Sequence, residues 1–516
     1  MGGSPRNHGW PGGPAGIRLV TQGSYGDSRN SWSRRSSRDR RSFHFYARIT
    51  QATSRASFRW QLLGGVLATV LTVVCVLGAA APAQAGWNAP VSISARGNIG
   101  PVRLAVNARG DAIAVWARVT RPVNLRRLQQ GYAVEAAFRP AQGTWEPPVI
   151  VGNAVQPCPR ETCGWPVPSV GIGARGGALV VWAGFTTSGA GVIRAASRTA
   201  GGGWQRPIVL DRLYGGEPQV ALDQRGNATA IWAACSAGCA IRVAFKPAGR
   251  PWRKPATIGS GLGAALALDA KGDAIAVWTN LLGNRAGYLV QSAFRPARGS
   301  WRRPVTIGRG GESYAPRVAA DARGDTIAVW ANAARPGECC PTTVQAAFRP
   351  AGGVWRHAVT LQHNKGGTGD VQLALGTLGT ATAVWVANGP GATVQVASRP
   401  AGGSWGAPIP IATSTGAIDS LGLGVDMRGN ALATWWVVEG DVQAAIGSPE
   451  GLWQPPISLG GGAPPQFQGA IGVADVAVDS QGNAVFVWIS DLGAGKSVVR
   501  AASFSRRGRS GEPASG

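Results

Sequence analysis

One phrase of sequence recurs eight times between Trp87 and Phe504, and it constrains the fold more than any other feature of the 516-residue chain. A clear copy covers residues 215–259, where VALDQRGNATAIW is followed by IRVAFKPAGRPWRKPATIG. The period is roughly 50 residues, and a repeat of this length is one supersecondary unit that buries its apolar surface only against its neighbours. We therefore expect a single repetitive architecture over residues 86–505.

Each repeat contains four short segments that are typical of β-strands. In the copy that begins at Pro316, the segments RVAAD, TIAVWA, TVQAAF and VWRHAVTL are separated by the turn DARGD, a variable loop and the turn RPAGG. Apolar runs rich in Val, Ile and Ala, bounded by Gly, Pro, Asn or Asp, indicate strands rather than helices. Four antiparallel strands, here called A to D, make one propeller blade. The sequence thus predicts an all-β, eight-bladed β-propeller.

The two ends of the repeat region predict how the ring closes. The last repeat has strands A, B and C but lacks the W-x-x-P strand, whereas an isolated W-x-x-P strand, Trp87–Ile93, precedes the first repeat. An open row of blades would expose two strand edges to pairing with other chains. We therefore expect Trp87–Ile93 to complete blade eight.

Two tryptophans mark each repeat. A residue that recurs at the same place in every unit indicates packing, because large aromatic rings supply much of the area buried where repeats meet. The tryptophan that ends strand B is Trp116, Trp182, Trp232, Trp278, Trp330, Trp385, Trp435 or Trp488, and the one that opens strand D is Trp87, Trp145, Trp204, Trp252, Trp301, Trp355, Trp405 or Trp453.

The N-terminal part of the chain differs from the repeats. Residues 1–61 are rich in Arg, Ser and Gly and predict a disordered basic tail. Residues 62–80 are uncharged and apolar, and an A-x-A pattern ends at Ala85, so residues 62–85 are either a cleaved signal peptide or an uncleaved membrane anchor. Either alternative places the propeller outside the membrane, secreted or at the cell surface. Residues 506–516 predict a disordered tail.

Six of the cysteines fall in close pairs, which in an exported chain predicts disulfides. Zinc is not expected, because no histidine lies near any pair and the repeat region holds two histidines in all, His357 and His363. No cofactor motif is present, so we expect neither a cofactor nor a metal. The pairs are Cys158 with Cys163, Cys235 with Cys239, and the adjacent Cys339 and Cys340, whose pairing stays open.

The nearly constant A–B and C–D turns should share one face of the ring, and they are basic. Such a face could contact an anionic envelope polymer, or its cations could stack on the neighbouring repeat tryptophans. Nucleic acid is not expected, because charge without a matching motif is weak evidence in an exported chain. The turn cations are Arg109, Arg175, Arg225, Lys271, Arg323 and Arg428 in the A–B turns, and Arg139, Arg198, Lys246, Arg295, Arg349 and Arg399 in the C–D turns.

The B–C and D–A loops vary in length and content and should share the opposite face. Variable loops on a rigid scaffold are where binding sites usually lie, and aromatic rings among carboxylates suit carbohydrate. The alternative is that these are ordinary loop residues. The candidate ligand-binding residues are Tyr132, Trp165, Tyr214, Glu217, Tyr288, Glu312, Tyr314 and Asp370.

The phrases W-x-x-P-V-x-L and V-A-x-D-x-x-G-N-A-x-A-V-W resemble those of secreted bacterial propeller proteins that are grouped with sialidase-like repeats. The resemblance covers nearly all of residues 86–505 and implies an architecture. It does not bring catalytic residues with it, because the sialidase Asp-box is not matched: Asp269 and Trp278 are nine positions apart instead of five.

These observations lead to a functional prediction and two alternatives. The first is an exported, monomeric, non-enzymatic propeller that binds glycans or proteins at the cell surface through its variable face. The second is a sialidase-like glycoside hydrolase or lyase with its site on the same face, which would need two carboxylates roughly 5–10 Å apart. The third is a scaffold for an envelope assembly, anchored through residues 62–80.

Overall fold

The computed structural model describes residues 86–124, 126–141, 143–158, 163–213, 215–236, 238–282, 287–310, 312–313, 316–333, 340–438, 440–461 and 474–506. The chain divides into two units, Met1–Pro82 and Ala83–Gly516, and all described residues belong to the second. The predicted basic tail and the predicted signal or anchor segment lie outside the described residues. Within the described ranges no helix has the length and apolarity needed to cross a membrane.

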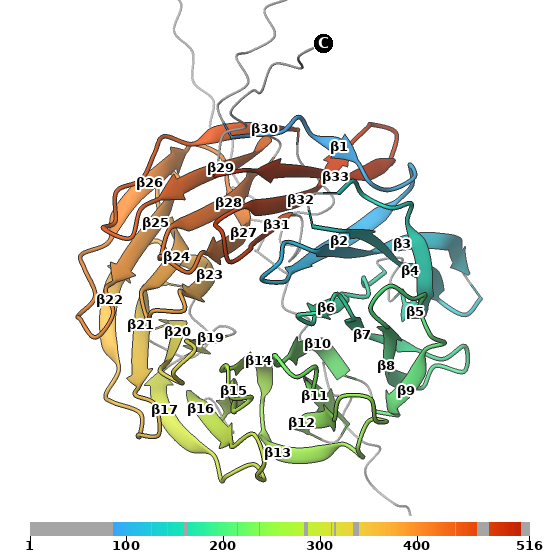
Figure 1. Ribbon diagram of the computed structural model, residues 1–516, viewed down its shortest axis with the longest axis horizontal. Coiled ribbons are helices and arrows are strands. Elements are labelled where there is room, and N and C mark those ends of the chain that lie inside the picture. Colours follow the sequence, from blue (N-terminus) through green and yellow to red (C-terminus); the bar gives the residue numbers. More distant parts are fainter. Residues whose placement is uncertain are drawn as a thin grey trace, which may run out of the picture. The chain divides into compact units, whose positions relative to one another are not determined.

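The second unit consists of antiparallel blades that stand side by side around one axis, as predicted (Figure 1). The first two blades are joined into one eight-stranded sheet by the pairing of Val155 with Phe185. They contain β2 (Ile99–Val106), β3 (Ala112–Asn124), β4 (Gln129–Arg139) and β5 (Val149–Pro157), then β6 (Ser169–Ile172), β7 (Ala178–Phe185), β8 (Gly191–Arg198) and β9 (Ile208–Asp211).

Blades 3 to 8 follow the same order, with strand A innermost and strand D at the rim. Blades 3 and 4 are β10 (Gly215–Leu222), β11 (Ala228–Cys235), β12 (Cys239–Lys246) and β13 (Ala256–Ser260), then β14 (Leu262–Leu268), β15 (Ala274–Leu281), β16 (Tyr288–Arg295) and β17 (Val305–Gly310). Blade 5 is β18 (Glu312–Ser313), β19 (Arg317–Ala320), β20 (Thr326–Ala333), β21 (Thr342–Arg349) and β22 (Val359–Asn364), and blade 6 is β23 (Thr368–Leu375), β24 (Ala381–Asn388), β25 (Ala392–Arg399) and β26 (Ile409–Ser414). Blade 7 is β27 (Ile418–Val425), β28 (Ala431–Val437), β29 (Asp441–Gly447) and β30 (Ile457–Gly461), and blade 8 is β31 (Ala474–Val478), β32 (Ala484–Asp491), β33 (Ser497–Phe504) and β1 (Val91–Ser92).

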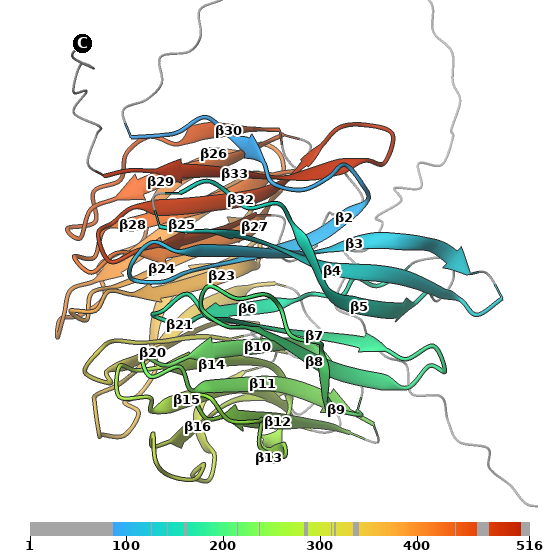
Figure 2. The same ribbon diagram turned by 45° about the vertical axis from the view of Figure 1, so that its right-hand side comes forward.

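The predicted closure is confirmed, because the N-terminal strand β1 is the rim strand of blade 8 (Figures 1 and 2). It pairs antiparallel with β33, with Val91 opposite Ala501. The pairing extends beyond β1 to a bridge between Trp87 and Phe504 and to the hydrogen bond from Ile93 N to Val499 O, 2.9 Å. We call this junction the seam.

The apolar core lies between adjacent blades. All eight tryptophans that end strand B are fully buried, which confirms that they are packing residues. Between blades 5 and 6, for example, Ile327 and Val329 of β20 pack in one cluster with Trp385 of β24. Alternation along strand B therefore gives each blade two apolar faces, one for each neighbour.

Polar side chains join the innermost strands of adjacent blades. The edge of these strands that faces the central axis would otherwise lack hydrogen-bond partners. Asp475 Oδ2 accepts a hydrogen bond from the Leu104 backbone N–H at 2.9 Å, from blade 8 to blade 1. Burial raises the pKa of Asp475, and the positive charge of Arg103 opposes that shift. Gln219 Oε1 makes the corresponding contact with Leu266 N, 3.2 Å, between blades 3 and 4.

The A–B turns show why the repeat phrase carries Asp and Gly. In blade 5, Asp321 Oδ1 accepts hydrogen bonds from the backbone N–H groups of Arg323, Gly324 and Asp325, each at 2.9 Å. Gly324 has a φ of +101°, a conformation that residues with a Cβ rarely adopt. Asp325 Oδ1 then accepts the Ala351 N–H at 2.7 Å, which ties the A–B turn to the C–D turn of the same blade.

Candidate functional site

Two of the predicted ligand-binding residues contact each other in the protein interior. Tyr132 on β4 is 1% exposed, and its ring centroid lies 5.1 Å from that of Trp165. Its hydroxyl donates to the Gly164 carbonyl at 2.9 Å, and burial raises the pKa of Tyr132. Trp165 covers Gly100 so closely that a Cβ there would lie 2.0 Å from Trp165 Cε3. This pair therefore fastens the loop that follows β5 onto blade 1.

The other candidates lie on separate elements. Asp370 on β23 pairs with Arg317 on β19, with 3.1 Å between Oδ1 and Nη2. Glu217 is exposed on β10, and Tyr288 is half-buried at the start of β16. Glu312 belongs to β18, and Tyr214 and Tyr314 lie outside the described residues. A binding site on the variable-loop face stays a prediction.

Both disulfides with described cysteines form as predicted. Cys158 bonds to Cys163, and Cys235 bonds to Cys239 across the B–C hairpin of blade 3, where the two residues are register partners. Cys339 lies outside the described residues, so the pairing of Cys339 and Cys340 stays open. Within the described residues no cluster of His, Cys, Asp or Glu could hold a metal ion.

The predicted basic face requires a correction, because the C–D cations are enclosed between blades. Four of the six pack over the phenylalanine that ends strand C of the preceding blade, whereas Arg139 lies over Trp145 of its own blade. The guanidinium-to-ring distances are 4.0 Å for Arg198 over Phe138, 4.6 Å for Arg295 over Phe245, 4.3 Å for Arg349 over Phe294 and 4.3 Å for Arg399 over Phe348. Burial lowers the pKa of Arg295, Arg349 and Arg399. The A–B cations, in contrast, remain exposed.

We call this series of stacked pairs the Phe–Arg ladder. It is present between blades 1 and 2 and from blade 3 through blade 6, and the residues differ at the other interfaces, including both that flank blade 7. Between blades 6 and 7, Ser398 replaces the phenylalanine and Gly447 replaces the arginine. Between blades 7 and 8, Ile446 and Phe504 stand at the two positions. The absence of two large side chains between blades 6 and 7 leaves space there unless neighbours fill it.

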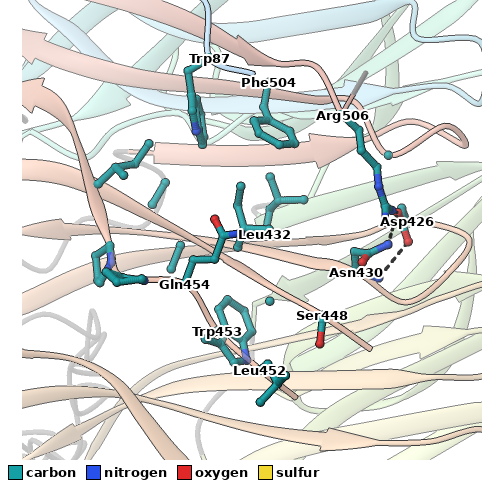
Figure 3. A pocket seen from close by; sticks show the side chains of 18 residues that line it. Trp87, Asp426, Asn430, Leu432, Ser448, Leu452, Trp453, Gln454, Phe504 and Arg506 are labelled. Carbon is teal, nitrogen blue, oxygen red and sulfur yellow. Dashed lines mark hydrogen bonds and ion pairs between the residues drawn. The ribbon is translucent and has the colours of Figure 1, made fainter. Parts of the chain in front are cut away.

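A cleft of about 680 Å³ lies between blades 7 and 8, next to the seam. Figure 3 shows Trp87 and Phe504 on one side and Trp453 and Leu452 on the opposite side, with Leu432 between them. The Trp87 and Phe504 rings are 5.2 Å apart, and Trp87 also packs 4.7 Å from Phe486. Because both aromatic walls are anchored by strand pairing, the cleft is a preformed feature of the fold. We call it the seam cleft.

Polar groups close one end of the seam cleft (Figure 3). Asp426 Oδ2 accepts hydrogen bonds from Arg506 Nη1 and Asn430 Nδ2, both at 2.7 Å. Asp426 Oδ1 is bonded to backbone N–H groups of its own turn, so this carboxylate is fully engaged. Arg506 and Gln454 are exposed and can offer further N–H groups to a ligand. Asp426 is the one carboxylate among the described lining residues, so the cleft lacks the carboxylate pair of a glycosidase.

A second cleft of about 680 Å³ lies on the other side of blade 7, between blades 6 and 7. It is lined by Trp405 of blade 6 and Trp453 of blade 7, with Thr380, Ser398 and Glu450 among the polar groups. Trp453 thus borders both clefts. Trp453 can reach this position because Gly447 has no side chain: a Cβ there would lie 2.5 Å from Trp453 Cε2.

The comparisons with known proteins show a similar architecture only. No protein-family model and no curated protein matches the sequence. Among solved structures, a lectin from Burkholderia pseudomallei is 14% identical with a TM-score of 0.43, over 70% of this chain and 100% of its own. The β-propeller domain of the trilobed protease from Pyrococcus furiosus is 8% identical with a TM-score of 0.42, over 70% of this chain and 95% of its own. A Hadza microbial sialidase is 18% identical with a TM-score of 0.34, over 57% of this chain and 64% of its own.

Proposed function

We propose that this protein is an exported carbohydrate-binding propeller and that the seam cleft is a binding site. The observation that carries the proposal is the composition of that cleft. Sugar rings stack their C–H faces on aromatic side chains, and here aromatic rings stand on both sides. Sugar hydroxyls take hydrogen bonds from amide and guanidinium groups, and Gln454, Asn430 and Arg506 lie along the same cleft.

The hydrogen bonds of the lining carboxylate support binding rather than catalysis. Hydrolysis of a glycosidic bond generally requires an acid and a base or nucleophile on opposite sides of that bond. Asp426 is held by an arginine, an amide and backbone N–H groups of its own turn, so its two oxygens are already occupied. We therefore propose a non-enzymatic role for this cleft. Export is supported by two disulfides, which persist in oxidising compartments.

Glycan-array screening of the full chain with neutral oligosaccharides, followed by calorimetric titration of the best-binding glycan, tests the proposal. Trp453→Ala should abolish measurable binding, because it removes one aromatic wall. Trp355→Ala is the matched control, since Trp355 holds the same repeat position in blade 5, where the Phe–Arg ladder is intact. Equal loss in both variants, or no neutral glycan bound, would contradict the proposal. Turnover of a bound glycan would favour the hydrolase or lyase alternative.

A further inference from the structure

The rim of blades 3, 4 and 5 carries a row of exposed cations, whereas the equivalent segments of the other blades carry a single one, Arg206 of blade 2. The segments before β13, β17 and β22 read W-R-K-P, W-R-R-P and W-R-H-A, whereas the residue after the rim tryptophan is Asn, Glu, Gln or Gly in the other five blades. Two further arginines lie in the C–D turns of blades 3 and 4. The seven exposed cations are Arg250, Arg253, Lys254, Arg298, Arg302, Arg303 and Arg356.

The rim segments that carry this row contain no acidic residue. The stretches 246–260, 295–310 and 349–361 contain neither Asp nor Glu. None of the seven cations forms an ion pair within the described part of the chain. Uncompensated like charges repel one another and raise the free energy of the folded state. Their concentration on three adjacent blades is therefore best explained by an anionic binding partner.

The fold holds three of these arginines in equivalent positions. Each packs over the phenylalanine of its own blade, and each donates its backbone N–H to the carbonyl of that phenylalanine at 2.8 Å. Each ring also lies against the buried ladder arginine of the next blade. The guanidinium-to-ring distances are 5.3 Å for Arg253 over Phe245, 5.2 Å for Arg302 over Phe294 and 5.3 Å for Arg356 over Phe348. Stacking reduces the entropy that an arginine loses on binding an anion.

Protection of strand edges explains part of this pattern, because charged side chains on a rim strand discourage pairing with other chains. That need is the same for every blade, however, and the rim segments of blades 6 and 7 present Gly406 and Gln454 instead. Edge protection therefore does not explain why the cations gather on three consecutive blades.

We propose that the rim of blades 3 to 5 binds a linear acidic polysaccharide, whose carboxylate or sulfate groups pair with the stacked guanidiniums of successive blades. Guanidinium matches both anions through paired N–H donors. A single-stranded nucleic acid fits less well, because it is normally bound by stacking its bases on exposed aromatic rings. Here Phe245, Phe294 and Phe348 are each stacked against two arginines. This surface is separate from the seam cleft and does not depend on it.

The test measures binding of the full chain to dextran sulfate, polygalacturonate and uncharged dextran at several salt concentrations. We expect binding to both polyanions, weaker at higher salt, and none to uncharged dextran. The triple variant Arg253→Gln, Arg302→Gln and Arg356→Gln should reduce polyanion affinity by at least tenfold, roughly the loss of a few charge-assisted contacts.

A control triple variant on the same blades removes the same charge from the A–B turns: Arg225→Gln, Lys271→Gln and Arg323→Gln. It should retain affinity within about threefold, the scatter expected for non-contacting surface changes, and both triple variants should keep the melting temperature of the native protein within a few degrees. Equal losses in the two triple variants would show a mere net-charge effect and would overturn the proposal. Tighter binding to single-stranded DNA or to anionic phospholipid vesicles than to either polysaccharide would also overturn it.

Discussion

Replacing Gly447 by alanine should disturb the candidate site with a single added methyl group. The new Cβ would lie 2.5 Å from Trp453 Cε2, 2.7 Å from Cδ2 and 2.8 Å from Cζ2. Carbon atoms in contact normally stand about 3.5–4.0 Å apart, so the indole must move outward by about 1 Å or leave its place. Overpacking of this kind typically costs about 1–3 kcal/mol. Since Trp453 borders both clefts, glycan affinity should fall together with stability.

Gly461→Ala in the same blade provides the control, because a Cβ at Gly461 has no atom within 4 Å. Both substitutions reduce the conformational entropy of the unfolded chain by a similar amount, about 0.4–1 kcal/mol, so the difference between them isolates the clash. Urea denaturation followed by tryptophan fluorescence gives the free energy of unfolding, and titration with the best-binding glycan gives affinity. Indistinguishable values for the two variants in both assays would refute the reasoning.

Three further perturbations test other parts of the structure. Arg349→Ala should lower the free energy of unfolding by about 1–3 kcal/mol in urea denaturation, because it removes both the cation and the aliphatic stem that cover Phe294; a change below 0.5 kcal/mol would count against the ladder. Burial raises the pKa of Asp475, so the folded state binds this proton more tightly than the unfolded state and stability is lost as pH rises above about 4. The melting temperature of Asp475→Asn should therefore rise relative to that of the native protein between pH 4 and pH 7. A difference in melting temperature that does not change with pH would refute this expectation. Replacing Cys235 and Cys239 by serine should cost about 2 kcal/mol, the value for a short closed loop, and unchanged stability would indicate that strand pairing alone holds the hairpin.

The parts of the fold that follow from local chemistry could be predicted from the sequence. The A–B turn of blade 5 needs a carboxylate at Asp321 and a positive φ at Gly324, and both requirements are visible within five residues. The seam was predictable for a different reason: a missing strand at one end of the repeats matches an extra strand at the other. In a repeat protein, counting the strands of each copy is enough to predict such a contact between distant parts of the sequence.

The candidate site could not be predicted in the same way, because it depends on residues that depart from the repeat. Gly447 looks like an ordinary turn glycine, and Ser398 like an ordinary strand residue. Their importance becomes visible only by comparison with the contact between Phe348 and Arg399 at the neighbouring interface. That contact joins positions about one repeat apart. Aligning the repeats and asking which copies lose both partners would have found the interruption. Tyr132 and Trp165, in contrast, were selected by residue type, and their mutual burial depends on a loop whose path the sequence does not specify.

The seam also sets the order in which this molecule can be completed. The first strand of the propeller emerges from the ribosome, and crosses any membrane, roughly 400 residues before its partner β33, since Val91 pairs with Ala501. Until then β1 has no strand to pair with, and the aromatic side of the seam cleft, contributed by Trp87 and Phe504, does not exist. A chain cut short anywhere before Phe504 would therefore lose the proposed binding site along with the closed ring, so ligand binding would report on whether synthesis passed Phe504.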